Sequence, residues 1–357
     1  MKGSKCCQRL NAVIVVSGTY VTAVAPWMPI RSTGVSCIRV NGVRQREDLW
    51  NDTSSLLLEL SLSRENKKTA KNSLPWINPI GGYGDMLMLS GVLKLVIEKD
   101  PSRRFNLIRR TNYLDILGRH PAIASVGFPP KNAKIIGVDY WYMEELGPGN
   151  HRAFQVLARS FGLETPVEER LYLHDEFVED PLLHNFLPWK KVNILIASAS
   201  DSPRKTVYPT IWHHLVDYLL SDGAFVMQAG RFNEQHIRNA YSVRGLTTPR
   251  QLVALIRKCD LVITVDNFIM HAAHLAGIPA VVIWGPTQHE VYGYPEQVHL
   301  QMRPMCGLRN GESCIVSEKN RGGGLYNTPC PLGERHCMDQ IKPEAIYEAS
   351  RKALLRG

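Results

Sequence analysis

Residues 265–287 read VDNFIMHAAHLAGIPAVVIWGPT, and this stretch decides the fold. An apolar strand ends at Asp266, a helix carrying His271 follows, a Gly277–Ile278–Pro279 turn comes next, and AVVIW forms a second strand. Alternating strands and helices form parallel sheets, and α/β proteins bind ligands at the carboxyl ends of such strands. Polar residues at these strand ends therefore predict a ligand site.

The same alternation extends in both directions along the chain. From residue 74, LPWINPIGGYGDMLMLSGVLKLVIEKDP predicts a short strand, a glycine-rich turn and an amphipathic helix. A second series begins at VNILIASAS, residues 192–200, and includes a helix that we expect over residues 232–242. After Thr287 we expect irregular chain and then a helix from about Pro343.

Four segments follow from this pattern. We expect an N-terminal extension over residues 1–72 without stable order, a Rossmann-like domain over 73–188, a second Rossmann-like domain over 189–340 and a closing helix over 341–357. The first 25 residues also resemble a secretory signal, with three basic residues before an apolar run. A leader and a wrongly chosen start codon both remain open.

Composition, net charge and cysteine content indicate the general class of protein and its location. The chain has 357 residues, 44% hydrophobic and 21% charged, which is typical of a soluble globular protein with two domains. A net charge of +9 favours anionic partners, but the basic residues are scattered and do not indicate nucleic-acid binding. Eight cysteines are too few for a disulfide scaffold, so we expect a reducing, cytoplasmic location.

The segment IGGYGD, residues 80–85, lies between the first predicted strand and its helix. Its glycines allow the backbone to approach a bound group, and the helix start favours negative charge there. The spacing does not match the dinucleotide motif GxGxxG, so that class of cofactor is disfavoured. Asp85 is either a helix cap or a reactive carboxylate.

Two segments of this sequence resemble one enzyme family. IGGYGD, together with LDILGRHPAIASV at residues 114–126, and DLVITVDNFIMHAAHLAGIPAVVIWGPT at 260–287 resemble the heptosyltransferase-like glycosyltransferase family 9. The resemblance implies the GT-B fold, with two Rossmann-like domains facing each other across a cleft. It also implies transfer of a sugar with inversion, typically from ADP-heptose to a lipopolysaccharide-type or other saccharide acceptor. In this scheme we expect no cofactor to be required for catalysis, and from the net charge of +9 we expect a cytoplasmic enzyme in peripheral contact with an anionic inner membrane.

The resemblance also implies roles for individual residues. It makes Asp85 the general base and Lys205 the cation that contacts the donor phosphates. The other expected donor-binding residues are Gly82, Gly84, Ser200, Glu234, Asp266, Asn267, His271 and Thr287. One position departs from the family, because Phe268 stands where a glycine is usual, and this leaves the identity of the donor open.

Plainer interpretations compete with several of these roles. Lys205 could lie in a solvated loop, Glu234 at an exposed helix start, and Thr287 at a helix cap. His274 could join His271 as a metal pair, but a histidine hydrogen-bonded within the fold is favoured.

Four cysteines near the end of the chain suggest a further site. A structural zinc or iron ion could be held by Cys306, Cys314, Cys330 and Cys337, although they include no Cys-x-x-Cys pair. For the whole protein, two alternative functions stay open: a nucleotide-sugar epimerase of the same fold, and a non-catalytic nucleotide-binding module.

Overall fold

A computed structural model describes most of the chain. The described residues are 13–17, 20–24, 74–110, 113–138, 152–174, 185, 187–302, 330 and 337–355. Contacts divide the chain into a unit over Met1–Trp50 and a unit over Asn51–Gly357. In the first unit, strands β1 (Val13–Ser17) and β2 (Tyr20–Val24) pair antiparallel. The rest of the predicted extension lies outside the described residues.

The first half of the second unit contains a four-stranded parallel sheet in the order β5-β4-β3-β6. When the strands are numbered along the chain, this is the 3-2-1-4 order of a Rossmann-like sheet. The switch point of the strand order lies between β3 and β6. The strands are β3 (Trp76–Asn78), β4 (Phe105–Ile108), β5 (Ile123–Gly127) and β6 (Ile135–Gly137). The helices that accompany them are α2 (Tyr83–Lys99), α3 (Leu114–Leu117) and α4 (Ala153–Ser160).

The second half contains a six-stranded parallel sheet in the order β12-β11-β10-β7-β8-β9. When the strands are numbered along the chain, this is the Rossmann arrangement 3-2-1-4-5-6. The chain adds strands on one side of β7 and then on the other, so the switch point of the strand order lies between β7 and β10. The strands are β7 (Asn193–Ala197), β8 (Phe225–Gln228), β9 (Tyr241–Ser242), β10 (Leu261–Val265), β11 (Ala280–Trp284) and β12 (Val298–Gln301). The helices are α6 (Pro209–Ser221), α7 (Pro249–Ile256), α8 (Phe268–Ala276), α9 (His289–Tyr292) and α10 (Pro343–Leu354).

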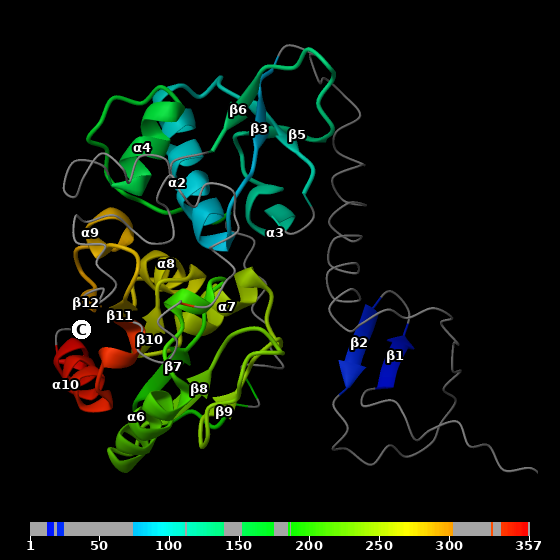
Figure 1. Cartoon of the computed structure of the whole chain (residues 1–357). Coiled ribbons are helices and arrows are strands. Elements are labelled where there is room, and N and C mark those ends of the chain that lie inside the picture. Colours follow the sequence, from blue (N-terminus) through cyan, green and yellow to red (C-terminus); the bar gives the residue numbers. More distant parts are fainter. Residues whose placement is uncertain are drawn as a thin grey trace, which may run out of the picture. The chain divides into compact units, whose positions relative to one another are not determined.

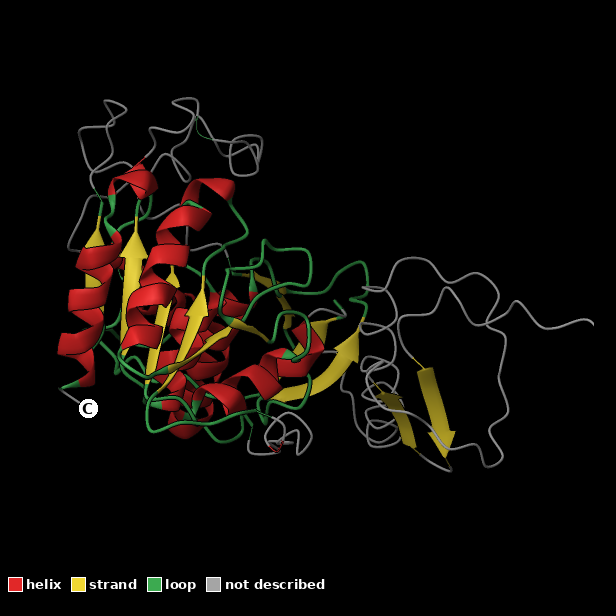
Figure 2. Cartoon of the chain, turned by 90° about the horizontal axis from the view of Figure 1, so that it is seen from below, coloured by secondary structure: helices red, strands yellow, loops and turns green. Residues whose placement is uncertain are grey.

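The central strands of the larger sheet are buried on both faces. In β7, Ile194 and Ile196 pack on one side of the sheet with residues of α6 and α10, while Leu195 packs on the other with residues of α7 and α8. Figure 1 labels these helices, and Figure 2 shows the strands side by side between helices. A parallel sheet covered on both faces is the architecture that the sequence predicts.

The helix α8 has a definite start and end. Its N-cap is Asn267, whose side-chain oxygen accepts a hydrogen bond from the backbone N–H of Ile269 at 2.8 Å. At the other end Gly277 adopts a left-handed conformation with φ of 71°, which a residue with a side chain rarely adopts. These two residues fix the position of the helix that follows Asp266.

Two local predictions are wrong. Residues 232–242 form turns and the strand β9 rather than a helix. The buried side chain of Gln228 explains this, because it accepts from Ile237 N and donates to Gln235 O, both at 2.8 Å, in place of helical hydrogen bonds. The chain after Thr287 is also more regular than predicted, since it forms the helix α9 and the strand β12, which pairs with β11 and extends the sheet. The domain boundaries after residues 188 and 340 stay predictions.

Candidate active site

Asp85 lies in the first turn of α2, directly after β3 and the glycine-rich segment. The helix begins at Tyr83, so Asp85 is its third residue, and its carboxylate accepts a hydrogen bond from the N–H of Gly82. Gly81 has φ of 116° and lies against this carboxylate, where a side chain would overlap it. Gly81 and Gly82 thus fold the turn around Asp85.

The second group of polar residues lies at the switch point of the larger sheet. Lys205, in the short 3₁₀ turn Pro203–Lys205 after β7, places its Nζ 3.2 Å from Oδ2 of Asp266. Asp266 follows β10, and its Oδ2 also accepts from the hydroxyl of Thr287 at 2.6 Å. The Lys205 and Asp266 side chains are only 12% and 11% exposed, so their attraction is weakly screened by water.

Asn267 joins the two strand ends of this switch point. Besides capping α8, its side-chain nitrogen donates to the carbonyl of Ala199 at 2.8 Å. Its side-chain oxygen accepts from the hydroxyl of Thr264 at 3.0 Å. Ser200, the next residue after Ala199, is half-buried in the same loop. Ser200, Lys205, Asp266 and Thr287 thus lie at one edge of the sheet, and their roles in donor binding stay predictions.

The two halves of the chain meet beside Asp85. Gly84 lies so close to the ring of His271 that an added Cβ would stand 2.5 Å from the ring carbon Cδ2 and 2.8 Å from Nε2. Gly82 lies against Asp201 of the second half, whose Oδ2 would be 3.4 Å from an added Cβ. The glycines at positions 82 and 84 allow α2 to approach the loops that carry the second group of residues.

Burial sets the protonation of Asp85. It raises the pKa of Asp85 to about 7, against the opposing effects of the Gly82 N–H and the Lys205 ammonium, while Asp266 and Asp201 raise it further. These interactions also show that residues from both halves lie within electrostatic reach of one carboxylate. A carboxylate with a pKa near 7 is suited to act as a general base at neutral pH.

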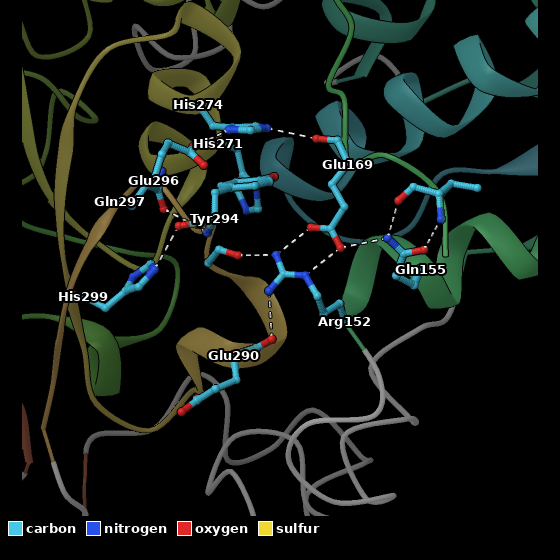
Figure 3. Close-up of polar contacts among 12 residues, drawn as sticks. Arg152, Gln155, Glu169, His271, His274, Glu290, Tyr294, Glu296, Gln297 and His299 are labelled. Atoms are coloured by element: carbon cyan, nitrogen blue, oxygen red, sulfur yellow. Dashed lines mark hydrogen bonds and ion pairs between the residues drawn. The ribbon is translucent and has the colours of Figure 1, made fainter. Parts of the chain in front are cut away.

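His271 is buried where the two halves meet. Its Nδ1 lies 2.7 Å from the hydroxyl of Tyr294, and burial lowers its pKa to about 4. His274 is hydrogen-bonded to Glu296 and to the carbonyl of Glu169, as the favoured interpretation expected (Figure 3).

Phe268 forms part of an aromatic cluster at the start of α8. Its ring packs edge-on against Tyr83 at 5.8 Å, and Tyr83 packs edge-on against Tyr113 at 5.9 Å. The hydroxyl of Tyr113 donates to the carbonyl of Gly81. The unusual residue at position 268 thus joins the start of α8 to the turn that holds Asp85.

Glu234 lies near the end of β8, at the same edge of the sheet. Its Oε1 accepts from the N–H of Arg231 at 2.9 Å, and its carboxylate packs on Gly230, whose φ is 146°. Burial raises the pKa of Glu234. The residue is half-buried and starts no helix, unlike the alternative of an exposed helix start.

Sequence reasoning missed several residues that border this region. Asp201 forms an ion pair with Arg231 and acts electrostatically on Asp85, and its position directly after Ser200 could have revealed it. Arg250 of α7 donates from its backbone N–H to Oδ2 of Asp115 in α3 at 3.1 Å. No local pattern in the sequence indicates that contact, which again joins the two halves.

Only two of the four cysteines in the predicted metal site lie among the described residues. Cys337 is buried and Cys330 half-buried, while Cys306 and Cys314 lie outside the described residues. Cys337 lies against Gly285 in the Gly-Pro-Thr turn. Among the described residues there is no group of three or more potential metal ligands, so the structural metal stays a prediction.

The described part of the chain also contains no helix of the length and apolarity needed to cross a bilayer.

Comparison with known proteins identifies the architecture and shows which family part of the chain resembles. The sequence model of glycosyltransferase family 9 (heptosyltransferase) matches residues 150–303. The structure resembles a family 9 glycosyltransferase from Veillonella parvula, with a TM-score of 0.57 and 15% identity over 80% of this chain and all of that one. It also resembles E. coli ADP-heptose lipopolysaccharide heptosyltransferase II, with a TM-score of 0.58 and 13% identity over 79% and 99% of the two chains.

A third solved structure is the dodecameric, iron-containing heptosyltransferase TibC of enterotoxigenic E. coli in complex with ADP-D-β-D-heptose. Its TM-score is 0.58, with 18% identity over 81% of this chain and 77% of that one. No curated protein sequence matches significantly. At these identities the solved structures establish the GT-B fold, and the sequence match shows a similarity to the family over residues 150–303. The chain is therefore a glycosyltransferase of the GT-B fold that is similar to glycosyltransferase family 9 over residues 150–303.

Proposed function

We propose that this glycosyltransferase moves a heptose-like sugar, with inversion, from a nucleoside diphosphate donor to a saccharide or lipopolysaccharide-type acceptor. The observation that carries the proposal is the position of Asp85. Its carboxylate has a pKa of about 7 and lies within electrostatic reach of Lys205 and Asp266 from the other half of the chain. A base and a cation on opposite sides of one reacting centre are what the transfer requires.

The proposed reaction is a single displacement. Asp85 takes the proton of an acceptor hydroxyl as the oxygen attacks the anomeric carbon, and the bond from that carbon to the diphosphate breaks. Attack opposite the leaving group inverts the configuration. The departing diphosphate gains negative charge, which the ammonium of Lys205 and the N-terminus of α8 stabilise. Asp266 and Thr287 hold Lys205 in place before the donor binds.

The remaining site residues have proposed roles around the donor. Ser200 and Asn267 lie at the strand ends on either side of the switch point, where the diphosphate would bind. Glu234 lies at the end of the neighbouring strand, in a position to accept hydrogen bonds from the ribose. Support for a heptose donor comes from TibC, which was solved with ADP-D-β-D-heptose. The net charge of +9 favours an anionic acceptor, such as one at the cytoplasmic face of the inner membrane.

Thermal unfolding with added nucleoside diphosphates tests the donor site. We expect ADP to raise the melting temperature of the wild type, because a ligand that binds only the folded state stabilises it. Lys205→Met should weaken ADP binding about tenfold or more, since it removes a hydrogen bond from a charged group. The matched control is Lys94→Met, which removes the Lys94–Glu98 pair and the contact of the Lys94 ammonium with the Tyr172 ring. If no nucleoside diphosphate shifts the wild type, the proposal fails.

Assays with candidate nucleotide sugars separate the alternatives. Release of nucleoside diphosphate that depends on an added saccharide acceptor supports the transferase. Conversion of the donor without an acceptor would indicate an epimerase instead. Nucleotide binding without turnover of any donor would indicate a non-catalytic module. Mass spectrometry of a nucleotide sugar that co-purifies with the protein would identify the donor.

A further inference from the structure

Tyr294 is buried beside His271, in a segment that no sequence pattern singled out. Its ring is 1% exposed and stacks on the ring of His274, with centroids 3.7 Å apart and planes 4° apart. Its hydroxyl lies 2.7 Å from Nδ1 of His271, and the two rings meet edge-on. Figure 3 shows Tyr294 between the two histidines.

Contacts from both halves of the chain hold Tyr294 in this position. His274, on which it stacks, is fixed by Glu296 at 2.5 Å and by the carbonyl of Glu169 at 3.0 Å. Arg152 binds both carboxylate oxygens of Glu169 at 2.6 Å and donates to the carbonyl of Gly293, the residue before Tyr294 (Figure 3). A side chain held this firmly presents its hydroxyl in one direction.

The number of available protons and acceptors determines whether the Tyr294 hydroxyl or Nδ1 of His271 donates this hydrogen bond. Within the described part of the chain, the bond to His271 is the only one that the Tyr294 hydroxyl makes. If Nδ1 of His271 donated to that oxygen, the phenolic proton would be a buried donor without an acceptor there, which is costly. Burial raises the pKa of Tyr294 well above 10, so the phenol keeps its proton at physiological pH. The hydroxyl therefore donates, and Nδ1 accepts.

This bond determines which nitrogen of His271 carries the ring proton. Burial lowers the pKa of His271 to about 4, so the ring is neutral at physiological pH and has one N–H. With Nδ1 acting as an acceptor, the proton is on Nε2. Nε2 lies on the side of the ring that faces Gly84, next to Asp85, and it has no hydrogen-bond partner among the described residues.

We propose that Tyr294 is a positioning residue that fixes His271 as a neutral Nε2–H donor, aimed at a hydroxyl of the transferred sugar beside Asp85. This rests on the proposed function for the identity of the ligand, but the assignment of the ring proton concerns the free protein alone. A neutral donor suits a sugar hydroxyl, because it binds the oxygen without adding positive charge next to the base.

The first experiment measures the tautomer directly. In ¹⁵N-labelled wild-type protein without ligand, correlation of the ring nitrogens with the ring protons should show His271 as the Nε2–H form. The chain has 12 histidines, and the signals of His271 are identified by their absence from the His271→Gln spectrum. A wild-type His271 protonated on Nδ1 overturns the proposal, whatever the activity of the enzyme and whether or not any variant folds.

The second experiment removes only the hydroxyl. Tyr294→Phe keeps the stacked ring, and we expect it to move part of His271 to the Nδ1–H form and to lower kcat/KM by roughly two- to tenfold, the worth of one hydrogen bond. In a His271→Gln background the same change should have no further effect, because Tyr294 acts through His271. Equal losses in both backgrounds, or an unchanged tautomer, overturn the proposal.

The control is Tyr347→Phe, which removes the hydroxyl bound to Asp222 on the exposed side of α10. It should leave both the His271 signals and kcat/KM unchanged. If the wild type neither binds nor turns over any nucleotide sugar, the proposed function fails while the tautomer result still stands. The two failures are therefore distinguishable.

Discussion

The two halves of the molecule build their parts of the active site in different ways. In the second half, Lys205, Asp266 and Thr287 come from three loops and bind one another at the ends of strands buried on both faces. In the first half, Asp85 takes a hydrogen bond from the turn of its own helix, after a strand of three residues. The proposed donor site is thus organised by the sheet, whereas the proposed base is organised by a local glycine turn.

This difference predicts that the proposed base can be removed without harm to the donor site. Asp85→Asn should lower turnover by about 10²- to 10⁴-fold, the usual contribution of general base catalysis. ADP affinity should stay near that of the wild type, because Lys205 and Asp266 do not depend on Asp85 for their positions. Steady-state rates and calorimetric titration with ADP measure the two effects.

The control for this variant lies at the other end of the same helix. Asp100 caps the C-terminus of α2 and binds Ser102 at the surface, so Asp100→Asn should leave turnover unchanged. Full activity of Asp85→Asn would remove the base from the proposed reaction.

The second prediction concerns pH and follows from the raised pKa of Asp85. Since that pKa is about 7, kcat/KM should fall about tenfold per pH unit below 7 as the carboxylate becomes protonated. The effect on stability has the opposite sign. An acid whose pKa is raised by folding favours the folded state at low pH, and this contribution is lost as the pH rises from about 4 through 7.

Both effects can be measured against Asp85→Asn. Urea unfolding of the wild type and the variant between pH 4 and 8 should show the variant gaining stability relative to the wild type as the pH rises. A pH-rate profile that is flat between pH 5 and 8, or a stability difference that does not change with pH, would contradict the raised pKa.

The smallest expected effect tests the contact between the halves. Gly84→Ala would place a methyl group about 2.5 Å from His271, so α2 and α8 must separate. We expect a loss of about 1–3 kcal/mol in the free energy of unfolding, the usual cost of overpacking. Chemical denaturation measures it, and kcat/KM should fall as well because Asp85 moves with the helix.

Gly127→Ala is the matched control for this substitution. Its added Cβ would lie 3.7 Å from the ring of Trp76, an ordinary contact, so its effect should be small. Equal stability of the two variants would show that the close approach at Gly84 does not constrain the halves.

Much of the fold could be predicted from local sequence. The periodicity of residues 260–287 and the turn at Gly277 depend on short-range effects, and the structure confirms the strand, helix and strand there. The prediction of a helix over 232–242 is wrong because the buried side chain of Gln228, in strand β8, forms hydrogen bonds with backbone groups of this segment in place of helical ones. Local propensity cannot include such a contact.

The candidate site divides in the same way. Sequence by itself determined that Lys205 and Asp266 follow strands of one parallel sheet and that Asp85 begins a helix, because strand ends and helix starts are set by nearby residues. Only the tertiary structure decided that Gly84 meets His271, that Asp201 acts on Asp85, and that Tyr294 holds His271. The first two contacts join the two halves of the chain, and Tyr294 contacts His271 from another loop of the second half, so burial and hydrogen bonding at the site arise only once these segments have packed together.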